Sequence, residues 1–127
     1  MYTKFIIFII FIFSIFFSKT IYANQTNIAI LMGLDKVTAR VSKFNAPESK
    51  HVKFGTLRIL ARACKKRPPE ETPETSVFLE IIDLRPGGSP KKVFTGWMFA
   101  SSPALSSLEH PTYDVWVIDC KTVSKSK

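Results

Sequence analysis

Apolar and polar positions alternate with a period close to two along most of the chain after residue 24, and no stretch keeps apolar residues at helical spacing for three turns. The runs are short, rich in β-branched residues and separated by turn signals such as Pro86-Gly87-Gly88. This pattern predicts an all-β domain, a small antiparallel barrel or sandwich of about seven strands.

The expected strands begin with a hairpin that has a tight turn at Asp35-Lys36. Gly55 lies between His51 to Phe54 and Leu57 to Cys64, and these two segments form either two short strands or one strand bent at a bulge. Ser76 to Asp83 carries enough apolar residues for a central strand. The expected strands are Ile28 to Leu34, Val37 to Phe44, His51 to Phe54, Leu57 to Cys64, Ser76 to Asp83, Lys92 to Phe99 and Tyr113 to Cys120.

Two of the segments that connect the expected strands have a distinctive composition. Residues 65–75 (KKRPPEETPET) contain three prolines and three glutamates, which predicts an exposed, semi-rigid loop. Pro103 to Leu108 is expected to form one or two helical turns, with Ser102 capping the first turn. The chain ends in a basic tail, residues 121–127.

The first 23 residues follow a different pattern. Phe5 to Phe17 follow Lys4 and are apolar apart from Ser14. The short segment 18–23 comes next and ends at Ala23. This predicts a secretory signal peptide, helical and cleaved after Ala23, that exports a single β domain of residues 24–127 to the periplasm. The alternative is an uncleaved membrane anchor, although the apolar run is shorter than the ~20 residues that a span needs.

The chain is basic, with 18 lysines and arginines against 10 acids and a net charge of +8. Cleavage removes two lysines and no acid, which leaves +6. Most of these charges are scattered, as solubilising surface charges are, and export excludes most nucleic-acid partners. The faces that carry Arg40, or Arg58 and Arg62, are either anion sites for peptidoglycan carboxylates or lipid phosphates, or are neutralised by acids on neighbouring strands.

Two cysteines, Cys64 and Cys120, are expected to form one disulfide, because an exported chain folds in an oxidising compartment. The bond would close a loop of 57 residues and stabilise the fold by about 4 kcal/mol. Strict alternation puts Cys64 on the face of Arg58 and Arg62, so either the bond lies at the rim or the strand changes face before it. No metal or cofactor is expected, because the histidines show no ligand spacing to the cysteines.

Large rings and polar side chains gather in the last third of the chain. The candidate binding residues are Trp97, Ser101, Ser102, His110, Tyr113, Asp114 and Trp116. Two uses of the rings stay open. Trp97 and Trp116 either pack across adjacent strands in the core, or form a shallow platform that stacks on a sugar ring or holds a peptide.

The same stretch contains the residue types of a hydrolase. Ser101 or Ser102 would be the nucleophile, His110 the base and Asp114 its orienting partner. No glycine-flanked elbow surrounds either serine, and Ser102 is the expected helix cap. Hydrolysis is therefore an alternative, and no catalytic residue is expected.

The run GWMFASSPALSSLEHPTYDVWVIDC (Gly96 to Cys120), with LDKVTARV, FGTLRILARACKKRPPE and FLEI upstream, resembles an exported alphaproteobacterial family known as domain of unknown function 2155. The resemblance covers essentially the whole mature chain. It implies an envelope location, with the Cys64 and Cys120 pair as part of the family pattern, and it implies no activity.

These features together lead to one functional expectation and two alternatives. We expect a non-enzymatic periplasmic domain that binds an envelope component, either a protein or a peptidoglycan-type glycan, with membrane contact only through an uncleaved signal segment. One alternative is a small envelope hydrolase that uses Ser101 or Ser102 with His110. The other is a purely structural envelope protein.

Overall fold

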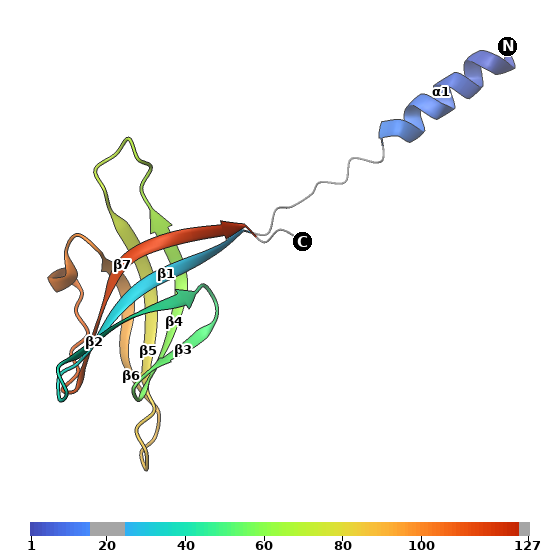
Figure 1. Cartoon of the computed structure of the whole chain (residues 1–127). Helices are drawn as coiled ribbons and strands as arrows, with labels where there is room; N and C mark the ends of the chain where they lie inside the picture. Colours follow the sequence, from blue (N-terminus) through green and yellow to red (C-terminus); the bar gives the residue numbers. More distant parts are fainter. Residues whose placement is uncertain (16–24, 125–127) are drawn as a thin grey trace.

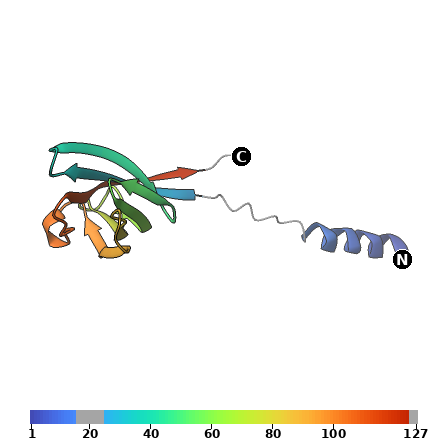
Figure 2. The same ribbon diagram turned by 90° about the horizontal axis from the view of Figure 1, so that it is seen from below.

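Seven strands form two antiparallel sheets that stack as a β-sandwich and do not close into a barrel (Figures 1 and 2). The computed structural model describes residues 1–15 and 25–124. The elements are α1 (Tyr2–Ile15), β1 (Gln25–Asp35), β2 (Arg40–Pro47), β3 (His51–Phe54), β4 (Leu57–Lys66), β5 (Thr75–Asp83), β6 (Lys91–Phe99), the 3₁₀ turn η1 (Pro103–Leu105) and β7 (Tyr113–Ser124). The expected all-β class and strand number are confirmed.

The first and last strands of the sandwich lie side by side. The three-stranded sheet has the order β2-β1-β7, and β1 pairs with β7 from Gln25 opposite Ser124 to Asp35 opposite Tyr113 (Figure 1). The four-stranded sheet has the order β3-β4-β5-β6, so β5 is central, as its apolar density predicts. Figure 2 shows the two sheets as separate layers.

Alternate residues of both sheets fill the space between the layers. In β5, Val77, Leu79 and Ile81 are fully buried while Phe78 and Glu80 stay half-exposed, as period-two alternation requires. Each large aliphatic side chain buried in this way contributes about 1.5–3 kcal/mol. The interior residues are Ala29, Leu31, Ala46, Leu57, Ile59, Ala61, Val77, Leu79, Ile81, Met98, Leu108, Val115 and Val117.

The helix expected in the apolar N-terminal segment is present as α1. Among the helices of residues 1–15 and 25–124, none has both the length and the hydropathy that a membrane crossing requires. The expected cleavage position after Ala23 lies outside the described residues.

The first hairpin turn is longer than the sequence predicts. The carboxylate of Asp35 accepts hydrogen bonds from the backbone N–H groups of Val37 and Thr38, and Ala39 takes a left-handed conformation with φ of 57°. This side-chain closure of the turn delays the second strand to Arg40, so the expected start at Val37 is wrong.

Other boundaries also differ from expectation. Strand β1 (Gln25–Asp35) extends beyond the expected Ile28 to Leu34, and β2 ends at Pro47 rather than at Phe44. The helical turn covers only Pro103–Leu105, and the Ser102 side chain makes no capping hydrogen bond. Strands β4 and β7 continue to Lys66 and Ser124, which shortens the proline-rich loop to residues 67–74 and places residues 121–124 of the basic tail in a strand. The stretch around Gly55 forms two strands, because Gly55 with φ of 57° makes a tight turn there.

Both cysteines face the interior because each of their strands carries a one-residue bulge. In β4 the pairing with β5 shifts between Ala61 and Ala63, which leaves Arg62 as the extra residue. In β7 the pairing with β1 skips Ile118. A bulge of one residue reverses the faces of the residues that follow it. Cys64 and Cys120 therefore point inward and form the predicted disulfide, with Cα atoms 6.0 Å apart.

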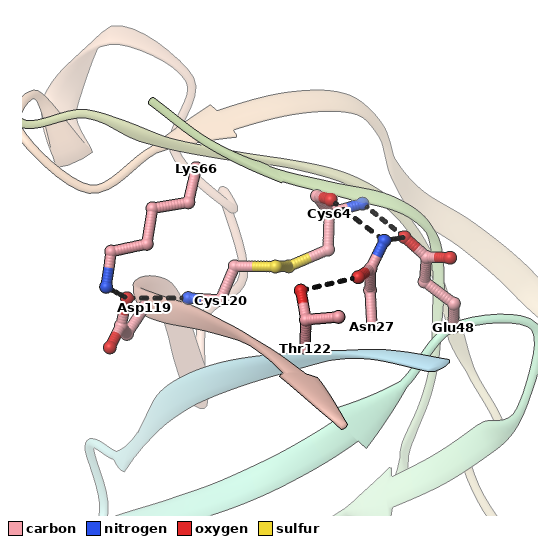
Figure 3. The surroundings of a disulfide bond; sticks show 7 residues. All are labelled: Asn27, Glu48, Cys64, Lys66, Asp119, Cys120 and Thr122. Atoms are coloured by element: carbon pink, nitrogen blue, oxygen red, sulfur yellow. Dashed lines mark hydrogen bonds and ion pairs between the residues drawn. A yellow bond between two sulfur atoms is a disulfide. The ribbon is translucent and has the colours of Figure 1, made fainter. Parts of the chain in front are cut away.

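Polar contacts between the sheets surround the disulfide (Figure 3). Glu48 accepts hydrogen bonds from the Cys64 N–H at 2.8 Å and from the Asn27 amide at 3.1 Å. On the other side, Lys66 of β4 pairs with Asp119 of β7 at 2.9 Å. The hydrogen bond from Lys66 lowers the pKa of Asp119 below its ordinary value, so the pair is charged at neutral pH. The disulfide and this ion pair together hold the ends of the two sheets against each other.

Replacing both cysteines, as Cys64→Ala and Cys120→Ala, is expected to lower the free energy of unfolding by about 2–5 kcal/mol, because the unfolded chain loses its cross-link. Urea denaturation of the double variant and the oxidised wild type measures the difference. A difference below about 1 kcal/mol would contradict the structural role of the bond.

Candidate functional site

The two tryptophans lie on opposite outer surfaces of the sandwich. Trp97 of β6 pairs with Phe78 on the outer face of the four-stranded sheet. Trp116 of β7 lies opposite Met32 on the outer face of the three-stranded sheet. Both rings are half-buried. Of the two uses left open for the rings, packing of Trp97 against Trp116 across adjacent strands is wrong, because β6 and β7 belong to different sheets.

The seven candidate residues do not form one surface. His110 and Tyr113 lie together, with ring centroids 5.3 Å apart, at the end of the sandwich where β7 begins. Asp114 lies opposite Leu34, on the same outer face as Trp116. Ser101 and Ser102 lie between β6 and η1, and Ser101 contacts the proline-rich loop.

His110 is a buried structural residue, 8% exposed, whose two ring nitrogens are both used. Its Nδ1 accepts hydrogen bonds from the N–H groups of Thr112 and Tyr113, each at 3.1 Å. Nδ1 is therefore unprotonated, and Nε2 carries the proton and donates it to Asp83 at 2.8 Å. The turn before β7 is fixed to β5 through this neutral imidazole.

Asp83 is the buried acceptor of this network and is only 1% exposed. It also accepts a hydrogen bond from the Thr56 hydroxyl at 2.8 Å and contacts the Arg85 guanidinium at 3.1 Å. Burial raises the pKa of Asp83, but the hydrogen bonds from His110 and Thr56 and the charge of Arg85 outweigh it, so the pKa lies below its usual value.

Two of the groups that the hydrolase alternative would use, Ser101 and His110, are engaged in other hydrogen bonds. The Ser101 hydroxyl and backbone N–H both bind the carboxylate of Glu74. These hydrogen bonds lower the pKa of Glu74. With both nitrogens of His110 engaged, the ring has no free lone pair to accept a serine proton.

A groove of about 520 Å³ runs between the proline-rich loop and the bulge of β7. Its walls include Pro68, Pro73, Ile118 and the two pairs Lys66 with Asp119 and Glu74 with Ser101. Lys66, Asp119 and Glu74 are engaged in these contacts, while Arg67 and Glu71, which also line the groove, form no ion pair among the described residues.

The outer face of the four-stranded sheet combines rings with unneutralised positive charge. Alternation and strand pairing place the rings of Phe78, Trp97 and Phe99 on this face, over β5 and β6. Phe78 and Trp97 contact each other edge to face at 5.5 Å. The face carries five cations, Lys53, Arg58, Arg62, Lys65 and Lys92, and one acid, Glu80, which Arg62 binds at 3.1 Å.

A shallow hollow of about 270 Å³ opens on this face, lined by Lys65, Ser76, Trp97 and Phe99. The Lys65 ammonium lies 5.8 Å from the Trp97 ring centroid. Two aromatic walls, a hydroxyl and an ammonium form a set that stacks on one side of a ligand and hydrogen-bonds its edge. This hollow and its cationic surroundings are the candidate site.

Three of the four residues that line the hollow were not among the sequence candidates. The positions of Ser76 and Phe99 follow from the alternation of β5 and β6, since each faces away from buried Val77 and Met98. The position of Lys65 could not be derived, because it depends on the bulge at Arg62. Within residues 1–15 and 25–124, no three His, Cys, Asp or Glu side chains lie close enough to hold a metal ion.

The fold and the site define a small β-sandwich domain that is cross-linked between its sheets and carries a cationic, aromatic outer face. The chain belongs to the family described as "Uncharacterized protein conserved in bacteria (DUF2155)", which matches residues 29–120. The resemblance drawn from the motifs is thereby confirmed.

An uncharacterized protein of Rickettsia prowazekii (strain Madrid E) is 29% identical over 99 residues. The match covers 78% of this chain and 63% of that protein, so the chain spans less than two thirds of this relative's length. No solved structure matches the chain.

The substitution Asp83→Asn is expected to lower the free energy of unfolding at pH 7 by about 1.5–3 kcal/mol, because the charged acceptor of a buried network is lost. In the wild type the folded pKa lies below the unfolded value of about 3.9, so the stabilisation is complete above that pH and is lost as the pH falls through the folded pKa. Denaturation between pH 2 and pH 7 measures both effects.

Glu80→Gln is the matched control, since its partner Arg62 is solvent-exposed and the pair contributes about 0.2–1 kcal/mol. The difference in the free energy of unfolding between the wild type and Asp83→Asn should become smaller below about pH 4, where Asp83 becomes protonated. A difference that stays constant with pH would contradict the buried, ionised Asp83.

Proposed function

We propose that this protein is a non-enzymatic periplasmic domain that binds a component of the cell envelope on the outer face of its four-stranded sheet. The observation that carries the proposal is the hollow at Lys65, Ser76, Trp97 and Phe99, where aromatic walls and polar donors meet on an otherwise flat sheet. Half-buried rings with hydrogen-bonding neighbours are typical of sites that hold a ring or a short chain segment.

Export is part of the proposal and is supported by two features. The apolar segment Phe5 to Phe17 after Lys4 has the composition of a signal peptide. The cross-sheet disulfide between Cys64 and Cys120 is of a kind that persists in oxidising compartments and is rare in the cytosol.

The alternatives receive less support from the geometry. A purely structural role is favoured when the rings are fully buried and no concave surface remains, but Trp97 and Trp116 are half-buried and the hollow is open. A hydrolase that uses His110 with Ser101 or Ser102 would need a ring nitrogen that the present hydrogen bonds occupy.

The experiment is co-sedimentation of the oxidised domain, residues 24–127, with washed envelope fragments of a Gram-negative bacterium. Trp97→Ala is expected to reduce the bound fraction at least fivefold, because it removes one wall of the hollow. Trp116→Ala is the matched control, a half-buried tryptophan on the opposite face, and should bind as the wild type does.

Lys65→Glu tests the same hollow without removing a ring, and since Lys65 is exposed this variant should stay folded. It is expected to lose binding as Trp97→Ala does. The proposal is wrong if the wild type stays in the supernatant, or if Trp97→Ala and Lys65→Glu both sediment like the wild type.

A further inference from the structure

One end of the outer face of the four-stranded sheet carries a row of cations that crosses the strands. Strand pairing aligns Lys53 of β3 with Arg58 of β4, Arg58 with Ile82 of β5, and Ile82 with Lys92 of β6. With neighbouring strands about 4.8 Å apart, the three cations lie within about 15 Å of one another. We call Lys53, Arg58 and Lys92 the cationic row.

The cationic row has no acid to neutralise it among the described residues. The one acid on this face, Glu80, forms an ion pair with Arg62. None of the ion pairs found among residues 1–15 and 25–124 involves Lys53, Arg58 or Lys92. Of the two alternatives that the sequence leaves open for these arginines, pairing with a neighbouring acid holds for Arg62, whereas Arg58 and Arg40 form no ion pair with any other residue that the structure describes.

Arg58 carries an unmet hydrogen-bonding need. Its Nε is buried and has no partner, the one such side-chain atom found in the described part of the chain. A buried donor without an acceptor costs about 1–3 kcal/mol. Arg58 as a whole is only half-buried, so a carboxylate can bind the part of its guanidinium that solvent reaches, where the neighbouring lysine charges would stabilise it.

The cationic row and the aromatic hollow lie on the same face, at opposite ends of the strands. In β5, Ile82 marks the row and Ser76 lines the hollow, six residues or about 20 Å apart. A ligand that uses both must be extended, with a ring at the hollow and a negative group about 20 Å away at the row.

We propose that the ligand of this face is a polysaccharide that carries carboxylates, with a sugar ring seated in the hollow against Trp97 and Phe99 and an acidic group bound by Arg58 in the cationic row. This inference rests on the proposed function and specifies its ligand. The apolar face of a sugar ring stacks on aromatic walls, and its hydroxyls accept from donors such as Lys65 and Ser76. An acidic peptide would satisfy the row, but it would fill the hollow only if it also carried a ring-bearing side chain at the matching distance.

The test uses purified peptidoglycan sacculi, either native or with their carboxylates converted to methylamides, in co-sedimentation with the oxidised domain. The wild type is expected to bind native sacculi and to bind the amidated form about tenfold more weakly. Arg58→Gln should lose about tenfold on native sacculi and nothing further on the amidated form, because both changes remove the same contact.

Arg40→Gln, the same change of charge on the other sheet, is the matched control and should stay within twofold of the wild type. Equal binding of native and amidated sacculi, or wild-type binding by Arg58→Gln, would overturn the inference. The proposed function would still stand in that case if Trp97→Ala loses binding to whole envelopes.

Two further probes distinguish other anionic ligands. Binding to phosphatidylglycerol vesicles with no binding to sacculi would assign the face to a membrane surface and would also overturn the inference. Equal affinity for polyglutamate and for native sacculi would show that the hollow takes no sugar ring, with the same consequence. If the wild type sediments with neither sacculi, vesicles nor whole envelopes, the proposed function fails together with the inference.

Discussion

The covalent bond between Cys64 and Cys120 is the constraint on which the rest of the structure depends. The two cysteines belong to different sheets, so both must face the interior to meet. If the side chains of each strand alternated strictly between the two faces, the buried residues Ala61 and Val117 would place both cysteines on the outer faces. One extra residue in each strand, Arg62 in β4 and Ile118 in β7, reverses the faces where the cysteines need it.

The same reversal in β4 builds the candidate site. Without the bulge, Lys65 would continue the buried series of Leu57, Ile59 and Ala61 and would place an ammonium in the core. With the bulge it emerges on the outer face beside Trp97, while Lys66 turns toward Asp119 between the sheets. The inserted residue in β4 therefore supplies the ion pair that flanks the disulfide and the cation of the hollow, and it supplies the disulfide together with the bulge at Ile118 in β7.

The sequence predicts the class, the central position of β5 and both ends of β3, because alternation and turn residues act locally. It predicts the disulfide because two cysteines in a chain expected to be exported are expected to pair. For β4 the sequence leaves a change of face before Cys64 as one of two alternatives, and the structure confirms that change. The sequence does not indicate the bulge in β7, because an extra residue is visible only against a partner strand. It also misplaces the tryptophans, since their sheet depends on which distant strands pair. His110 carries the residue type of a catalytic base, but its partner Asp83 is 27 positions away, and that pairing makes it structural.

Removal of Arg62 tests the central claim most directly, because it abolishes the bulge of β4 and leaves every cysteine in the chain. Free thiols are counted with a colorimetric reagent in the native, oxidised protein, with Arg62→Ala as the control that keeps the chain length. The account predicts two free thiols per chain after the deletion and none in the control. A deletion variant that stays folded and still shows no free thiol would contradict it.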